Sequence, residues 1–80
     1  MNIKILGSGC KKCVALGDNA KAAAASAGID ADIEKVTDII AIAGYGIMST
    51  PGLVINEKVV SSGRVLTPAE ITPLLQEARP

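Results

Sequence analysis

A short apolar strand that leads through a glycine-rich turn into an alanine-rich helix constrains the fold of this chain more than any other feature of its sequence. Asn2–Leu6 is apolar and contains β-branched residues, and it ends at Gly7-Ser8-Gly9, as a strand that enters a tight loop does. Cys10–Ala27 is rich in alanine, the best helix former, and Gly28 is a natural end for that helix. The chain therefore begins with a βα unit.

The rest of the chain continues this alternation of elements. The segment Ile29–Val36 alternates apolar and charged residues, which predicts a strand with one solvated face. Thr37 or Asp38 can cap the short helix that follows, and two short strands then form a hairpin around Asn56-Glu57. The pattern Thr67-Pro68-Ala69-Glu70 is a good start for a last helix. The predicted ranges are Ile29–Val36, Asp38–Ala43, Gly52–Asn56, Lys58–Ser61 and Pro68–Ala78, with a loop over Ile47–Pro51.

The order of these elements predicts an α/β fold with the sequence βαβαββα. Two βα units favour parallel strands joined by right-handed crossovers, and the closing hairpin adds an antiparallel strand. The expected architecture is a mixed four-stranded sheet with helices on both faces. A chain of 80 residues leaves room for one domain, which spans residues 1–80.

The composition excludes several classes of function. The chain has 8 basic and 8 acidic residues, so it lacks the basic footprint of a nucleic-acid-binding protein. It has no Phe, no Trp and one Tyr, which leaves no platform for stacking bases. With no His, imidazole catalysis and most zinc-enzyme sites are excluded. Neither a signal peptide nor an apolar run of about 20 residues is visible, so we expect a cytoplasmic protein without membrane insertion.

The sequence Gly9-Cys10-Lys11-Lys12-Cys13 is the motif that carries chemistry. It follows a predicted strand and opens a predicted helix, whose N-terminus presents unpaired N–H groups and a partial positive charge. This position and the two neighbouring lysines should lower the pKa of the Cys10 thiol, which makes Cys10 the expected nucleophile. Cys13 lies three residues later on the same side of the first turn, where it can resolve a mixed disulfide.

Other interpretations of the two cysteines stay open at this point. Two thiolates at this spacing can hold Cu(I), or form half of a zinc site that a partner protein or a second copy completes. They can also be inert buried thiols or an incidental crosslink. In a reducing compartment, a close cysteine pair is more often used for redox or metal chemistry than as a structural disulfide.

A second signal is the sequence Ser49-Thr50-Pro51-Gly52, just before a predicted strand. A cis bond is only slightly disfavoured before proline, and a cis Pro51 would leave the backbone groups of Thr50 outside the sheet. Those groups could then bind an extended peptide segment near the cysteines. An ordinary trans proline at the entrance of a strand is an equally good interpretation.

Together, these features resemble the thioredoxin-like superfamily. More narrowly, the chain resembles the small redox-active disulfide proteins of archaea and bacteria, a thioredoxin/glutaredoxin-like group. The resemblance covers essentially the whole chain and is close over residues 46–64, which read GIMSTPGLVINEKVVSSGR. At two positions the chain departs from thioredoxins, because Gly9 and Lys11 stand where thioredoxins carry tryptophan and usually proline.

The resemblance implies a fold and a set of roles. It implies the βαβαββα fold and thiol–disulfide exchange, with Cys10 as the attacking thiol and Cys13 as the resolving thiol. Thr50 and Pro51 would form a cis-proline loop that faces the disulfide. Gly63 would lie in the turn where glutaredoxins hold part of glutathione. No metal and no cofactor other than the Cys10–Cys13 disulfide is implied, and a flavin-dependent reductase would regenerate the reduced form.

The expected function is that of a small thiol–disulfide oxidoreductase acting on disulfide-containing proteins, and we expect a monomer. Gly9, Lys11, Lys12 and Gly63 are expected to support the site. One alternative is a metal carrier that uses the same two thiolates, which would bind Cu(I) or zinc tightly without redox turnover. Another is a redox sensor or adaptor that docks on one partner, and the motif alone does not distinguish it from an oxidoreductase.

Overall fold

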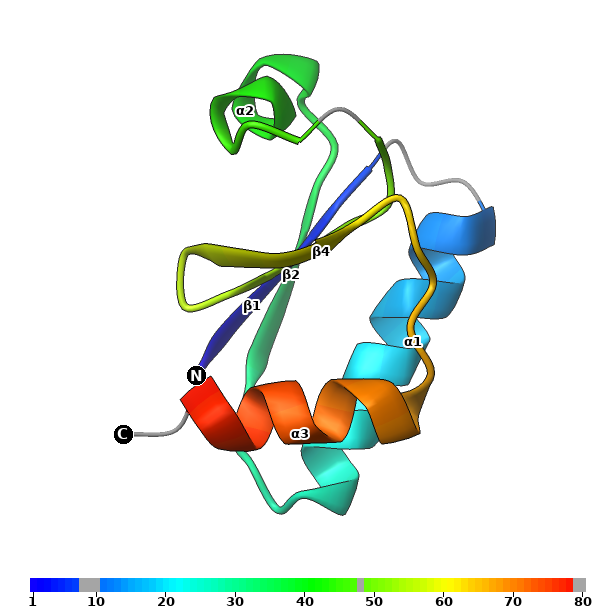
Figure 1. Ribbon diagram of the computed structural model, residues 1–80, viewed down its shortest axis with the longest axis vertical. Helices are drawn as coiled ribbons and strands as arrows, with labels where there is room; N and C mark the ends of the chain where they lie inside the picture. Colours follow the sequence, from blue (N-terminus) through cyan, green and yellow to red (C-terminus); the bar gives the residue numbers. More distant parts are fainter. Residues whose placement is uncertain (8–10, 48, 79–80) are drawn as a thin grey trace.

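A computed structural model describes residues 1–7, 11–47 and 49–78 of the chain, so the expectations for Gly9 and Cys10 fall outside the described residues. Seven elements follow one another in the order βαβαββα (Figure 1). They are β1 (Asn2–Leu6), α1 (Lys11–Ser26), β2 (Asp32–Val36), α2 (Ile39–Gly44), β3 (Gly52–Ile55), β4 (Lys58–Ser62) and α3 (Pro68–Ala78). No helix in the described ranges is long and apolar enough to cross a membrane.

The four strands form one mixed sheet with the order β2-β1-β3-β4. β1 pairs in parallel with β2 and antiparallel with β3, and β3 pairs antiparallel with β4. The parallel pair brings the carboxyl ends of β1 and β2 to the same edge of the sheet, where Leu6 lies opposite Val36. The predicted fold class, a mixed four-stranded sheet with helices on both faces, is confirmed.

α1 and α3 cover one face of the sheet and pack against each other beneath it (Figure 1). α1 contributes Leu16 together with small alanines such as Ala20 and Ala23, all fully buried. Because these alanine side chains are short, the helix lies close to the sheet and to α3. The main core consists of Ile3, Ile5, Leu16, Ala20, Ala23, Ala24, Leu53, Ile55, Leu66, Ile71 and Leu75.

The opposite face of the sheet carries the six-residue helix α2. Ile42 packs against Leu6 and Val54 in a second, smaller core. Beside it, the Lys4 ammonium donates to Tyr45 Oη at 3.0 Å and to a Glu57 carboxylate oxygen, and the Tyr45 hydroxyl donates to the other Glu57 oxygen at 3.1 Å. This Lys4–Tyr45–Glu57 network ties the end of α2 to β1 and to the β3–β4 turn.

The start of β2 differs from the prediction. The alternating pattern begins at Ile29, but the strand begins at Asp32, because β1 begins at Asn2, which is the register partner of Asp32. The three residues before Asp32 therefore have no neighbouring strand to pair with. Gly28, with a φ of +68°, ends the turn that follows α1.

The remaining element ends follow local chemistry that the sequence already indicated. The Asp38 carboxylate accepts from Ile40 N–H at 3.1 Å and caps α2. At the start of α3, the Thr67 hydroxyl accepts from Glu70 N–H at 3.2 Å, and Glu70 accepts in return from Thr67 N–H at 3.1 Å. The two-residue hairpin turn between β3 and β4 has positive φ at both central residues, Asn56 and Glu57.

Candidate functional site

The site is organised around Gly7, the residue that follows β1. Its N–H donates to the Val36 carbonyl at 2.9 Å, which holds it at the edge where β1 and β2 end. A Cβ on Gly7 would overlap the Cys13 Sγ atom, and it would lie 3.8 Å from Thr50 Cβ. The absence of a side chain at Gly7 therefore lets the Cys13 thiol and the Thr50 loop converge on the end of the central strand.

Cys13 lies in the first turn of α1 and is 4% exposed. A small hollow of about 20 Å³ lies beside it and is also lined by Ile5, Gly7, Val14, Lys35 and Thr37. Such a volume holds about one water molecule. The Cys13 side chain is thus shielded from any large molecule.

The loop that faces Cys13 contains a cis peptide bond between Thr50 and Pro51. Pro51 is fully buried, whereas Thr50 and Ser49 are exposed. The loop therefore presents Thr50 to the solvent next to the buried thiol, while Pro51 anchors the loop to the protein.

Gly63 supports this loop from the end of β4. Its N–H donates to the Pro51 carbonyl at 2.8 Å, and its φ is +72°. A Cβ on Gly63 would lie 2.9 Å from Ser49 Cβ, closer than real Cβ atoms approach. A glycine is therefore required here by two independent constraints, the left-handed backbone and the approach of Ser49.

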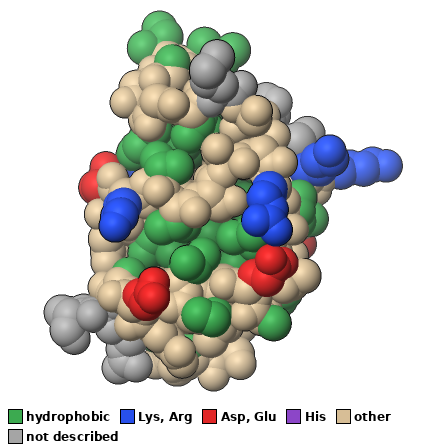
Figure 2. Space-filling model, in the orientation of Figure 1, with side chains coloured by type: hydrophobic (Ala, Val, Ile, Leu, Met, Phe, Trp, Pro, Cys, Tyr) green, Lys and Arg blue, Asp and Glu red, His purple; other side chains and the backbone are tan. Residues whose placement is uncertain are grey.

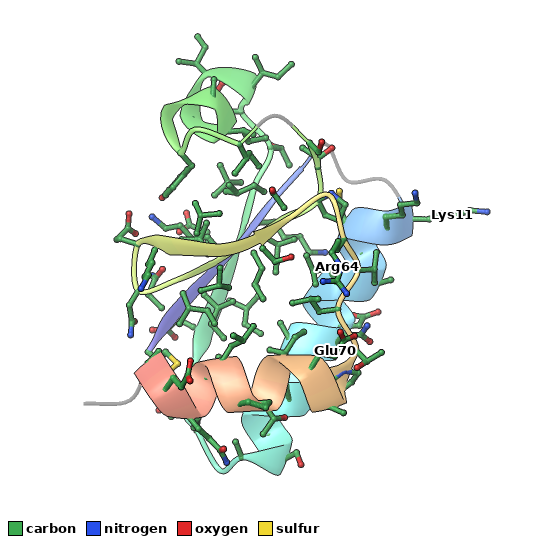
Figure 3. The ribbon with its side chains drawn as sticks, in the orientation of Figure 1. Lys11, Arg64 and Glu70 are labelled. Atoms are coloured by element: carbon green, nitrogen blue, oxygen red, sulfur yellow. The ribbon has the colours of Figure 1, made fainter. Side chains whose placement is uncertain are left out.

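Exposed basic side chains lie near the site. Lys11 and Lys12 are exposed at the start of α1, and Arg64 follows Gly63 (Figure 3). Arg64 lies 3.4 Å from the Glu70 carboxylate. The pKa of Glu70 is held below its usual value chiefly by the hydrogen bond from the Thr67 backbone, then by the Thr67 hydroxyl, with a smaller effect from Arg64.

The structure brings together four of the residues predicted for the site, namely Cys13, Thr50, Pro51 and Gly63. The predicted residues Lys11 and Lys12 lie at the start of α1. The sequence analysis named Gly7 only as the end of a strand and Thr37 only as a possible helix cap, and it gave Lys35 no role. Lys35 and Thr37 could have been found from topology, because β2 was expected to lie parallel to β1 and its last residues then meet the same edge.

A βαβαββα fold with a buried cysteine in the first turn of its first helix, facing a cis-prolyl loop, defines a thioredoxin-like protein. Comparisons with known proteins agree with this class. The family model described as the thioredoxin domain matches residues 1–76. A thioredoxin of Methanothermobacter thermautotrophicus is 37% identical over 75 residues, which are 94% of this chain and 97% of that protein.

A second relative extends the same comparison. A thioredoxin of Methanocaldococcus jannaschii is 41% identical over 69 residues, which are 86% of this chain and 79% of that protein. The chain therefore belongs to the thioredoxin family and is a thioredoxin-like oxidoreductase.

Proposed function

We propose that this protein exchanges disulfides with partner proteins through Cys10 and Cys13, with Cys10 as the attacking thiol and Cys13 as the resolving thiol. The observation that carries the proposal is the placement of Cys13, which is buried against Gly7 and next to the exposed Thr50 loop. A resolving thiol must be shielded from bulky substrates and still reach a sulfur beside it. Membership of the thioredoxin family supports the same chemistry.

The first step forms a mixed disulfide. The Cys10 thiolate attacks one sulfur of the substrate disulfide, a bond forms between these two sulfurs, and the substrate disulfide breaks. The second substrate sulfur leaves as a thiolate and takes up a proton. Lys11 and Lys12, which are exposed beside the cysteines in the sequence, stabilise the thiolate form of Cys10 by their positive charge.

The second step releases the substrate. The Cys13 thiol loses its proton, and its sulfur attacks Cys10 in the mixed disulfide, which forms the Cys10–Cys13 disulfide and expels the remaining substrate sulfur as a thiolate. This thiolate also takes up a proton, so the substrate gains two electrons and two protons in all. Both electrons and the Cys13 proton come from the protein, and the other proton comes from the solvent because Cys10 starts as a thiolate. A flavin-dependent reductase of the thioredoxin-reductase type returns two electrons to the oxidised pair, so that the cycle can repeat.

The Thr50 loop binds the segment of substrate that flanks the disulfide. Thr50 is exposed and lies beside Gly7 and Cys13, and its backbone groups lie outside the strand that begins at Gly52. An extended peptide can pair with these groups as a short additional strand. Gly63, which contacts Ser49 and Pro51, keeps the loop in place for this contact.

We propose that the protein acts on disulfide-containing proteins in the cytoplasm and that it works as a monomer. We also propose that it binds no nucleic acid, because its basic and acidic residues are equal in number.

A trapping experiment tests the proposal. Cys13→Ser should accumulate a stable mixed disulfide between Cys10 and a disulfide-bearing substrate, because the resolving step is blocked. Cys10→Ser is the matched control and should trap nothing. The complexes are detected by intact mass spectrometry after acid quenching, with a chelator present to exclude metal-bridged species. If Cys13→Ser traps no substrate, or if the two variants trap equally, the proposed roles are wrong.

A further inference from the structure

The end of the molecule that carries the candidate site differs in charge from the rest. We define this site end by residues 7, 11–14, 35–40, 47, 49–51 and 61–66, which are the carboxyl ends of β1, β2 and β4 and the segments beside them. Its basic side chains, Lys11, Lys12, Lys35 and Arg64, are all exposed. We call these four residues the basic rim. Figure 2 shows basic side chains that project near the start of α1.

Acidic side chains within the site end do not cancel this charge. Asp38 is the single acidic residue in these ranges, and its carboxylate caps α2 by accepting from Ile40 N–H. From outside the ranges, Glu70 lies 3.4 Å from Arg64, in a contact exposed on both sides. Within the described part of the chain, Lys11 and Lys12 make no ion pair. Because the whole chain has a net charge of zero, its basic and acidic residues are segregated.

The basic rim flanks the position where a substrate would lie. Lys11 projects from the first turn of α1, and Arg64 projects from the loop between β4 and α3 (Figure 3). Arg64 directly follows Gly63, which contacts the Thr50–Pro51 loop through Ser49 and Pro51. Two different elements therefore carry cations next to the Thr50 loop and Cys13.

We propose that the basic rim selects partner proteins whose disulfide is flanked by acidic residues. This inference rests on the proposed function and names the class of substrate for that site. The rim attracts an acidic segment as it approaches and holds it beside the cysteines. Since exposed charges are screened within about 10 Å at 0.1 M salt, the preference is strongest at low ionic strength.

Three disulfide peptides of identical length test the inference, with glutamate, glutamine or lysine on both sides of the disulfide. The second-order rate constant for oxidation of the reduced protein is measured for each peptide by quenched-flow alkylation. Each value is divided by that for reduction of the same peptide by dithiothreitol, which corrects for the intrinsic reactivity of the peptide. We expect the glutamate peptide to react about tenfold faster than the lysine peptide at low salt, and the ratio to approach one at 0.5 M salt.

Two double variants with the same loss of charge provide the control. Lys11→Gln/Lys12→Gln should bring the glutamate-to-lysine rate ratio close to one. Lys21→Gln/Lys58→Gln removes two exposed cations outside the site end and should leave the ratio unchanged. The ratio is compared within each variant, so a change in the reactivity of the attacking thiol cancels.

The outcomes separate this inference from the proposed function. If the protein reduces none of the three peptides, the proposed function itself is overturned. If it reduces all three at the same corrected rate, the oxidoreductase function stands and the basic rim has no role in selection. If both double variants lower the ratio equally, only the total charge acts and the assignment to the rim is wrong.

Discussion

Replacement of Gly7 by alanine tests the idea that the site depends on an absent side chain. Gly7 does not have a positive φ, so alanine fits the backbone and any effect must come from contacts. The new Cβ would overlap Cys13 Sγ and would lie 3.3 Å from Cys13 Cβ. Since Cys13 is fixed in the first turn of α1, relief requires a new side-chain rotamer or a shift of the helix.

The size of the effect follows from known costs of overpacking. An extra methyl group in a well-packed interior typically costs about 1–3 kcal/mol. For a domain of this length, each kcal/mol lowers the melting temperature by about 4–8 °C. We therefore expect Gly7→Ala to lower the free energy of unfolding by about 1–3 kcal/mol.

Gly17 offers a matched control, because it is a buried glycine within α1 that lies against Ile5. A Cβ there would lie 3.8 Å from Ile5 Cγ1 and 3.9 Å from Lys35 Cε, which are ordinary contact distances. Alanine is also the better helix former, so Gly17→Ala should raise the free energy of unfolding by about 0.4–1 kcal/mol. The two glycine-to-alanine changes are thus expected to have opposite signs.

Urea unfolding of both variants, with excess dithiothreitol to keep the thiols reduced, measures these changes directly. A second readout is the lifetime of the mixed disulfide with substrate, which should lengthen in Gly7→Ala because Cys13 Sγ is displaced from its position. A Gly7→Ala protein as stable as the wild type, with an unchanged lifetime, would refute the reasoning.

Two further predictions concern the loop support and the Lys4–Tyr45–Glu57 network. Gly63→Ala should lower the free energy of unfolding by about 1–2 kcal/mol because its backbone is left-handed. The close contact with Ser49 Cβ should lower it further, and adding Ser49→Gly to the same chain should recover only this second part. Urea unfolding of the single and double variants measures both parts, and full recovery would contradict the backbone argument. The hydrogen bond from Lys4, and then that from Tyr45, lowers the pKa of Glu57. Wild type should therefore be more stable than Glu57→Gln above about pH 4.5, and the difference should vanish as the pH falls through the lowered pKa. An equal difference at pH 7 and pH 3 would show that the charge of Glu57 is irrelevant.

Much of the fold could be predicted because its signals are local. The capping pattern from Thr67 to Glu70 marks the start of α3 by a direct exchange of hydrogen bonds, and Asp38 caps α2 by accepting from Ile40 N–H. The predicted start of β2 was wrong, because the alternation that begins at Ile29 indicates which side chains share a face but not where the neighbouring strand begins. That limit is set by Asn2, which is distant in sequence from Asp32.

Some residues of the candidate site could likewise be recognised from the sequence, and others only from the folded structure. The motif that contains Cys13 and the Thr50-Pro51 pair could be recognised from residue types in sequence. From the sequence, Gly7 could be interpreted only as the end of a strand. The requirement for glycine there comes from the position that Cys13 Sγ takes once α1 has packed on the sheet. The hollow between Lys35 and Cys13 likewise exists only once β2 lies beside β1.

Main-chain hydrogen bonds hold both sides of the site, from Gly7 N–H to the Val36 carbonyl and from Gly63 N–H to the Pro51 carbonyl. The frame needs glycine at both positions because a Cβ would overlap Cys13 Sγ at Gly7 and crowd Ser49 at Gly63. It places no demand on the exposed side chains of Lys12 or Arg64. Partner preference can change by substitution at the surface while the frame stays intact. A chain built in this way is a good starting point for orthogonal redox pairs, in which complementary charges are exchanged between the protein and its partner.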